Sequence, residues 1–485
     1  MNNTYYRNPE WIVKVQRPDY TKSTITYKTV PEWSQTGYQV SKVEFSSSLD
    51  KTNYLYGNTD LIGYEYEESI GSPGNPFSLT LVPIEDKKGH TWKDKIKARD
   101  VVSIIEFGKV RYIGIVKSTG YSSSMDNNGN PIRSIVISGE SLGGMISSFN
   151  LPMNLYLWYN VGADAANRKL FEDLNSVAAK GQSIGEVFRK IKEDFFEVVF
   201  GADFGGFIAV LDAYFSLDID KLEAYYPMNL KPFQIDTNNL WEIFRQIAPT
   251  PIYELFGRFE KDKYRLICRE TPFDTQDWNK LKRTEINTLY LISQNLSDSD
   301  GQVYTHYFSQ MPNSALTEAE IWVNSSLSEI SVFDKDKLPI YGYNQLKATF
   351  PFFDLDKGRA ESSINFLKNN SARMYAWYKN NVDFLSGKIE MMTVPDKENN
   401  YISIGERISH FQGSNNSIEF YVEAVKRKMD YPGTMTSEYS VTRGYEYGYA
   451  SVTVEGVTLS TPQVKRISQQ GRKMIQSEKD ITGGR

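Results

Sequence analysis

The sequence predicts a mainly β protein of the α+β class, in which two copies of one small antiparallel β unit flank a helical and mixed insertion. Three observations predict this fold. Alternation of apolar and polar residues is strongest at residues 77–139 and again at residues 401–444. Apolar residues at helical spacing gather between these stretches, and the strand pattern of the first stretch recurs in the second.

The recurrence covers three strand-like runs in each copy. The offset between the copies is about 305 residues and places Gly139 opposite Gly444, and self-similarity of this kind is typical of repeated structural units. We therefore interpret the two stretches as two copies of one antiparallel unit. The runs are residues 96–104, 111–117 and 134–139 in the earlier copy, and 401–408, 418–426 and 438–444 in the later copy.

Length and composition are those of a soluble multidomain protein. The 485 residues allow about two to four domains, because single hydrophobic cores stop growing at a few hundred residues. A hydrophobic content of 40% and a net charge of −5 indicate a globular chain. Cys268 is the single cysteine and excludes an internal disulfide; its strand-like neighbours predict a buried thiol. The N-terminus lacks the pattern of a secretory signal peptide.

Strand signals come first along the chain. Residues 11–15 and 40–45 predict strands of an N-terminal β arm. Residues 77–81 alternate and begin the first β unit, in which a tight turn at Gly108 and an Asn/Gly-rich turn at residues 126–129 join successive strands.

Helix signals follow in the middle of the chain. Helical spacing predicts helices at residues 164–180 and 184–200, and a further helix after Thr237. Residues 195–215 are the most membrane-like segment, but acidic residues interrupt it, so a buried helical insertion is expected. Strands return at residues 252–259 and 264–269, a long helix is expected at residues 359–380, and the polar tail from residue 451 is expected to be extended.

One short motif suggests an enzyme. Gly139, Ser141 and Gly143 fit the Gly-x-Ser-x-Gly pattern of a nucleophile elbow. A true elbow needs a parallel α/β sheet, whereas the strands before Ser141 are hairpin-linked and therefore antiparallel. We favour a glycine-rich exit from the domain and keep a serine hydrolase as an alternative.

No other motif indicates catalysis or a cofactor. His90, His306 and His410 are far apart in the sequence and lack metal-ligand spacing. Asp298 and Asp300 resemble half a calcium loop but lack the later glutamate. The sequence contains no phosphate-binding glycine loop, and the mildly basic tail indicates a solvated segment rather than a nucleic-acid arm. We expect no cofactor and no metal.

Several runs, in their order and spacing, resemble the central baseplate hub proteins of contractile phage tails and related contractile injection systems, the tail-hub or late-control family. The resemblance spans residues 77–448, and no appended lysozyme or peptidase segment is recognised. The helix-like run 359–379 resembles the family helix, 387–391 and 404–408 its strand and turn entering a barrel, 420–425 and 439–444 its closing hairpin, and 264–273 its middle-domain strand.

The resemblance implies two tube-type antiparallel β-barrels per chain and a structural, non-enzymatic role. In such hubs three chains form a pseudo-six-fold ring that adapts a hexameric tail tube above to a trimeric spike below and lines the conduit. The implied domains are an N-terminal β arm (1–76), a first barrel (77–150), a helical insertion (151–250), a mixed α/β middle domain (251–350), a second barrel (351–448) and an extended tail (449–485).

The implied partners follow from the same resemblance. They are two further copies of the chain, a tail-tube ring, a central spike protein, outer baseplate or wedge proteins, and a tape-measure protein or DNA passing through the lumen. Stable membrane insertion is not expected, and the expected location is a virion or injection particle assembled in the bacterial cytoplasm.

The residues expected to matter for a hub are those of barrel cores or interprotomer contacts, because alternation predicts their burial but not the chain that buries them. We expect no catalytic residue among them. A monomeric β-rich binding protein is a further alternative. The expected positions are Val101, Ile104, Tyr112, Ile113, Ile137, Ile408, Phe420, Val422, Tyr439 and Val441.

Overall fold

The computed structural model describes most of the chain, with the longest internal gaps at residues 149–204, 220–238 and 311–329. Two helices expected at residues 164–180 and 184–200, Asp300 of the expected calcium-like loop, and the tail beyond residue 462 lie outside the described residues. The described ranges are 10–33, 40–47, 60–148, 205–219, 239–298, 302–310, 330–350, 360–393, 401–411, 417–430, 434–446, 449–454 and 457–462, without residues 23, 126–128 and 130.

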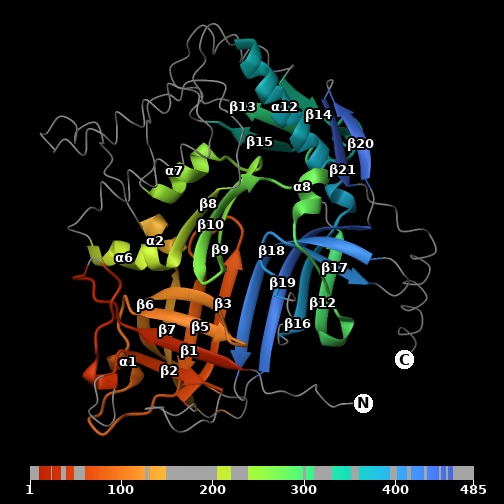
Figure 1. Ribbon diagram of the computed structural model, residues 1–485. Coiled ribbons are helices and arrows are strands. Elements are labelled where there is room, and N and C mark those ends of the chain that lie inside the picture. Colours follow the sequence, from red (N-terminus) through yellow and green to blue (C-terminus); the bar gives the residue numbers. More distant parts are fainter. Residues whose placement is uncertain are drawn as a thin grey trace, which may run out of the picture.

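One large sheet dominates the molecule, and strands from both ends of the chain build it (Figure 1). Its main path runs β12-β16-β19-β18-β3-β4-β7-β6-β5-β1-β2, and β17 and β11 continue from β18 beside this path. The strands are β1 (Trp11–Gln16), β2 (Lys42–Ser46), β3 (Leu61–Ser69), β4 (Pro76–Leu81), β5 (Val101–Glu106), β6 (Lys109–Met125), β7 (Pro131–Ser141), β11 (Arg283–Glu285), β12 (Leu291–Asp298), β16 (Leu385–Met392), β17 (Arg407–Phe411), β18 (Ser417–Asp430) and β19 (Thr434–Glu446).

The mainly β, α+β class expected from the sequence is confirmed, but the sheet of the single chain is open. Its path ends at β12 on one side and at β2 on the other, so the described strands form no closed barrel. The two expected barrels are instead curved halves of one sheet, joined where β3 pairs with β18.

Smaller elements stand above the large sheet in Figure 1. A three-stranded sheet, β8-β10-β9, lies near the middle and contacts α6, and a second, β14-β13-β15, packs against α12. The bounds are α6 (Gly205–Tyr214), β8 (Phe215–Ile219), α7 (Leu240–Ile247), β9 (Tyr253–Glu260), β10 (Lys263–Glu270), α8 (Thr275–Lys280), β13 (His306–Gln310), β14 (Ser331–Phe333), α11 (Leu338–Tyr341), β15 (Gln345–Thr349) and α12 (Ala360–Tyr378), with short helices α1 (Trp92–Lys95), α2 (Gly143–Ser148), η1 (Pro31–Trp33), η5 (Thr288–Tyr290) and η6 (Asn381–Asp383).

Local sequence explains where these elements begin and turn. The Asn239 side chain accepts a hydrogen bond from the Glu242 backbone N–H and so caps α7, as Asp274 caps α8. Phe107 and Gly108 both have positive φ and close the tight turn between β5 and β6. The strands expected at residues 252–259 and 264–269 and the helix expected at residues 359–380 are confirmed as β9, β10 and α12.

The tail begins with a hairpin. β20 (Tyr449–Val454) and β21 (Val457–Pro462) pair antiparallel and contact α12. The sequence carried a signal for it, because apolar residues alternate on both sides of Glu455-Gly456.

Among the described residues, three groups of buried apolar side chains hold the structure together. One lies within the N-terminal part of the large sheet, a second lies within its C-terminal part, and the third connects β9, β10, α7 and α12 to both. Within the described residues, no helix combines the length and the apolar composition that crossing a bilayer requires.

Candidate interface between the two strand units

The large sheet contains the same five-strand unit twice. In the N-terminal unit the neighbours run β3-β4-β7-β6-β5, and in the C-terminal unit they run β12-β16-β19-β18-β17. Each pair of neighbours within either unit is antiparallel. The repeat seen in the sequence therefore extends from three strands to five.

Two of the irregularities in the pairing recur at matching places in the two units. The ladder of β3 shifts between Leu61 and Gly63, and the ladder of β12 shifts between Leu291 and Ser293. β6 and β18 likewise carry bulges where their pairing with the next strand skips one residue, Lys117 in β6 and Glu423 in β18. Because a bulge fixes the local register of a strand, β3 corresponds to β12 and β6 to β18 residue by residue around these bulges.

This correspondence corrects the expected offset between the copies at one point. Val116 pairs with Gly139 in the N-terminal unit, and the equivalent Val422 pairs with Val441 in the C-terminal unit. Gly139 therefore corresponds to Val441 rather than to Gly444. The constant offset fails here because the whole β6–β7 hairpin beyond Val116 is longer than the β18–β19 hairpin beyond Val422, in its strands as well as in its loop.

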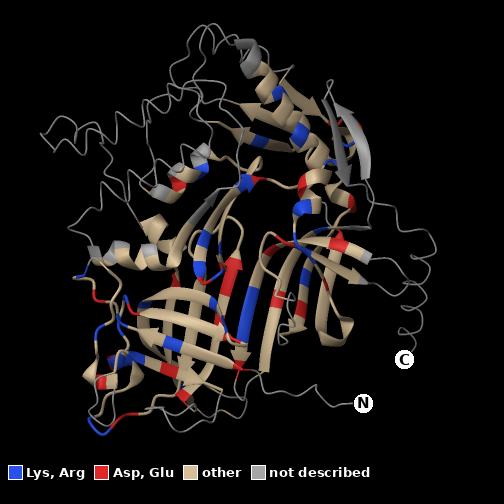
Figure 2. Ribbon diagram, in the orientation of Figure 1, with Lys and Arg blue, Asp and Glu red and all other residues tan. Residues whose placement is uncertain are grey.

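The two units meet along one seam, which we define as the antiparallel pairing of β3 residues 63–69 with β18 residues 424–430. Figure 2 shows acidic residues of β3 beside basic residues of β18. Glu65 and Lys426 form an ion pair of 3.0 Å across it. Opposite charges on neighbouring strands favour this register over a slipped one.

Arg427 is the buried centre of the seam. Its guanidinium lies 3.7 Å from the centroid of the Tyr401 ring and donates a hydrogen bond of 2.6 Å to the Ile402 carbonyl. Burial alone would lower the pKa of Arg427, but Tyr401, Tyr66 and nearby Glu106 hold it above its ordinary value. Burial raises the pKa of Glu106, and Arg427 opposes that rise.

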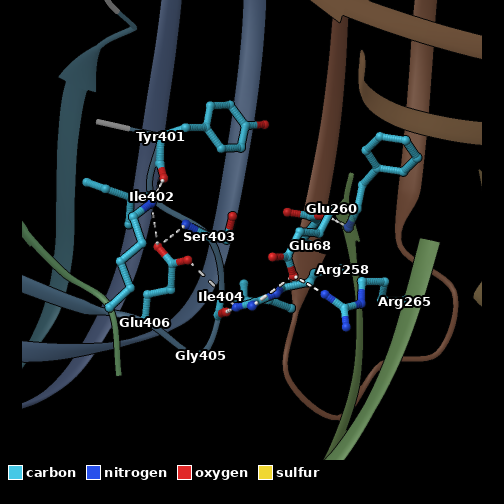
Figure 3. A network of polar contacts seen from close by, with 12 residues as sticks. Glu68, Arg258, Glu260, Arg265, Tyr401, Ile402, Ser403, Ile404, Gly405 and Glu406 are labelled. Atoms are coloured by element: carbon cyan, nitrogen blue, oxygen red, sulfur yellow. Dashed lines mark hydrogen bonds and ion pairs between the residues drawn. The ribbon is translucent and has the colours of Figure 1, made fainter. Parts of the chain in front are cut away.

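The β9–β10 hairpin braces the seam from one side (Figure 3). Glu68 of β3 accepts a hydrogen bond of 2.9 Å from the Phe259 N–H, and Arg258 donates one of 3.2 Å to the Ile404 carbonyl. Arg258 also lies 3.8 Å from Glu406. The hairpin therefore contacts the first strand of one unit and the segment that enters β17 of the other.

A second polar cluster fixes the C-terminal unit to the same hairpin. The Tyr421 hydroxyl donates to Glu254 at 2.7 Å, and Arg269 donates to Glu254 at 3.0 Å and to the Gly405 carbonyl at 3.0 Å. Burial raises the pKa of Tyr421, and the adjacent Glu254 raises it further, so the phenol stays protonated and can donate.

The expected core positions are all buried within the single chain. They do not form one cluster: the positions on β5, β6 and β7 and those on β17, β18 and β19 lie in different cores. Ile104, Tyr112 and Ile137 share the N-terminal core, Val101 and Ile113 belong to the connecting core, and Ile408, Phe420, Val422, Tyr439 and Val441 share the C-terminal core.

Sequence reasoning missed the charged residues of the seam. The signal was an acidic run at Glu65, Glu67 and Glu68 and a basic run at residues 426–428, each on a strand. The charges of the two runs are complementary, but the sequence does not show which strands are neighbours, so it does not predict that these two strands pair.

Ser141 ends an antiparallel strand and supports the backbone of a neighbouring segment. It is buried, and its hydroxyl accepts a hydrogen bond of 3.0 Å from the Asn75 N–H. It pairs with Gly114 of β6 in the antiparallel ladder. The hydroxyl is thus engaged in holding the start of β4 against the end of β7.

The single cysteine and the three histidines differ in their burial and contacts. Cys268 is buried, as expected. His306 stacks on Phe333 with ring centroids 4.1 Å apart, His410 is buried, and His90 is exposed. Among the described residues, no group of three or more His, Cys, Asp and Glu side chains is placed to hold a metal ion.

No protein-family model matches the sequence, and the search of curated proteins finds no match. Solved structures that the chain is similar to include a tail protein from Neisseria meningitidis MC58, at 10% identity over 89% of this chain and 96% of that one, with a TM-score of 0.48. Another is the 43 kDa tail protein of prophage MuSo2 from Shewanella oneidensis, at 10% identity over 90% and 97% of the two chains, with a TM-score of 0.44. A third is a chain of the Francisella PdpA-VgrG complex, at 11% identity over 96% of this chain and 61% of that one, with a TM-score of 0.43.

These solved structures are tail proteins and a VgrG complex, which are proteins of the kind that the sequence resemblance named. Each TM-score is below 0.5, so a proposal about function has to rest on the geometry of this chain.

Proposed function

We propose that this protein is a structural hub of a contractile tail or injection particle, in which three chains form a ring of six similar β units. The ring adapts a six-fold tail tube to a three-fold central spike and lines the conduit between them. The observation that carries this proposal is the pair of equivalent five-strand units joined edge to edge within one chain.

Symmetry explains why such a chain suits this role. The contact between the two equivalent units of one chain is head to tail, and the same kind of contact would join one chain to the next. Repeated head-to-tail contacts close into a ring when the rotation between neighbours permits it. Three chains then present six similar units to one partner and three identical chains to another. A protein without an internal repeat would match only one of these symmetries.

The strand units and the insertion between them have different parts in this role. β3 to β7 form one ring unit, and β12 with β16 to β19 form the other. Residues 302–380, which carry β13, β14, β15 and α12, are inserted between β12 and β16 and are suited to contact outer baseplate or wedge proteins. A tape-measure protein or DNA would pass through the lumen, and the particle would be assembled in the bacterial cytoplasm.

The proposed role needs no catalytic residue. A tail-associated serine hydrolase acting through Ser141 remains the alternative, and its test is direct. Purified protein and the Ser141→Ala variant are compared on ester and cell-wall substrates. Equal inactivity of both supports the hub, whereas activity that the substitution abolishes supports the hydrolase.

Mass in solution tests the assembly. Sedimentation equilibrium is measured over a wide concentration range, alone and with a trimeric spike partner. A trimer in either condition supports the hub. A single monomeric mass in both conditions supports a monomeric β-rich binding protein instead.

A further inference from the structure

Comparison of the two units identifies two strand edges, one in each unit, that no described strand covers. In the C-terminal unit, the distal half of β18 is covered on its outer edge by β3, the first strand of the N-terminal unit. In the N-terminal unit, β6 is the counterpart of β18, and β5 pairs only with its first half. Within the described part of the chain, no strand pairs with the outer edge of β6 residues 118–125.

In the seam the equivalent edge is covered by β3, and the counterpart of β3 lies at the other end of the sheet. β12 corresponds to β3, and it is the terminal strand of the main path, with β16 as its one neighbour among the described strands. The two free edges belong to the same sheet but are seven strand steps apart, or about 34 Å measured along the sheet at the usual strand spacing. Within the described residues of the single chain they do not pair.

We propose that β12 of one protomer pairs antiparallel with the distal half of β6 of the next, in the register that the seam defines. In the seam Arg427 pairs with Tyr66 and Lys428 pairs with Glu65. The equivalent pairs between protomers are Tyr121 with Leu296 and Ser122 with Asn295. This inference rests on the ring of the proposed function and names the surface that closes it.

Burial supports this pairing independently of topology. Val425, Arg427 and Met429 are buried beneath the seam. Their counterparts Thr119, Tyr121 and Ser123 are partly or fully exposed, and Tyr121 is 57% exposed. Large apolar side chains are exposed on or beside both free edges: Tyr121, Met125 and Ile132 at one, and Leu289, Ile292 and Met392 at the other.

The composition of the edges also favours a strand partner. Soluble proteins protect free edges with lysines, prolines or short strands. Residues 118–125 contain no charged residue or proline, and β12 carries a single charge at Asp298. Neither edge repels a strand of another copy, and opposite residues are small, polar or apolar.

A disulfide placed by this register tests the proposal. Paired residues on antiparallel strands have Cα atoms about 4.5–5.5 Å apart, within the range that a disulfide bridges. The full-length Ser122→Cys, Asn295→Cys double variant is oxidised and run on a non-reducing gel. We expect a covalent trimer that dithiothreitol converts to monomer, because three bonds close the ring.

The matched control moves one cysteine two residues along the same face of the strand. Ser122→Cys with Ser297→Cys places the Cα atoms beyond disulfide reach in the proposed register, by about 7 Å along the strand. We expect little covalent trimer from it. Circular dichroism checks the fold of each variant, and both sites are exposed in the single chain.

The crosslinking and sedimentation results together distinguish a wrong interface from a wrong ring. If sedimentation shows a trimer but the two cysteine pairs crosslink equally poorly, the proposed edges are wrong and the hub stands. If the in-register pair crosslinks into an open ladder beyond three chains, the edges are right and the three-chain ring is wrong. If neither trimer nor crosslink forms with spike present, both proposals fail.

Charge offers a second test that needs no oxidation. Ser122→Lys with Asn295→Glu copies the Lys428 and Glu65 pair of the seam into the interface between protomers. Ser122→Glu with Asn295→Glu places like charges there. We expect the first variant to tighten the trimer and the second to weaken it, each by about 1.5- to 5-fold per contact. Equal trimer stability in the two variants would overturn the register.

Discussion

Arg427 of β18 and Tyr401, which lies ahead of β17, form a buried cation–aromatic contact of 3.7 Å at the centre of the seam. Burial of the guanidinium is nearly complete. The contact joins the two strand units because Arg427 also lies over Tyr66 of β3, at 5.9 Å from the ring centroid. Glu68 and Glu106 of the N-terminal unit are buried near the same cation.

Removing the Arg427 guanidinium should strongly weaken the seam between the two strand units. We expect Arg427→Leu to lower the free energy of unfolding by about 3–5 kcal/mol, since it leaves the buried Glu68 and Glu106 without the nearby positive charge. Chemical denaturation measures the change. Arg133→Leu, at an exposed position on β7, is the control and should change stability by about 0.5 kcal/mol or less. Equal effects of the two substitutions would contradict the role of Arg427.

The ion pair at the rim of the seam should contribute much less. Glu65 and Lys426 are both partly exposed, so we expect a coupling of about 0.2–1 kcal/mol. A double-mutant cycle with Glu65→Gln and Lys426→Met measures it. The coupling should shrink as salt is added, because salt screens exposed charges. A coupling that salt does not alter would mean that the pair acts through packing.

Gly387 holds β12 close to β16. Its φ is +150°, and a Cβ atom there would lie 1.9 Å from the Asn295 carbonyl oxygen of β12. We expect Gly387→Ala to destabilise the chain by about 1–3 kcal/mol and to disturb the β12 edge. Gly120→Ala on the free edge of β6 is the control, because nothing lies within 4 Å of its Cβ position. It should leave the free energy of unfolding nearly unchanged.

Buried histidine should make the fold sensitive to mild acid. Burial lowers the pKa of His410 below its ordinary value of 6.5, so the unfolded chain takes up the proton first as the pH falls. The contribution of His410 to stability is present above pH 6.5 and is lost as the pH falls below it. Wild type should therefore lose more free energy of unfolding than His410→Gln between about pH 7.5 and about pH 5.5.

The control for this pH effect is His90→Gln, because His90 is exposed. Denaturation curves at the two pH values give the comparison for all three proteins. If His410→Gln loses as much stability on acidification as wild type does, then burial of His410 is not the cause of the pH dependence.

Much of the fold could be predicted from local patterns. Alternation in residues 77–81 and the apolar face of the helix around Leu367 and Trp377 were sufficient, because each pattern reflects burial on one side of one element. The three-strand repeat was visible for the same reason. Both copies keep a long strand between two shorter pairing partners.

The rest depended on contacts that local sequence does not encode. β12 was not recognised as a member of the second unit because residues 302–380 separate it from β16, and its residues are mostly polar and exposed. The seam was missed because β3 and β18 are hundreds of residues apart in the chain. Ser141 was ambiguous because its pattern fits an elbow, and only the antiparallel pairing with Gly114 revealed its role.

Imaging the purified assembly tests the central claim most directly. Averaged electron micrographs of the full-length protein, with spike added if the protein alone is monomeric, should show one ring with six similar inner lobes around a channel and three-fold features outside. A ring with another number of inner lobes, or only single-chain particles under both conditions, would contradict the account.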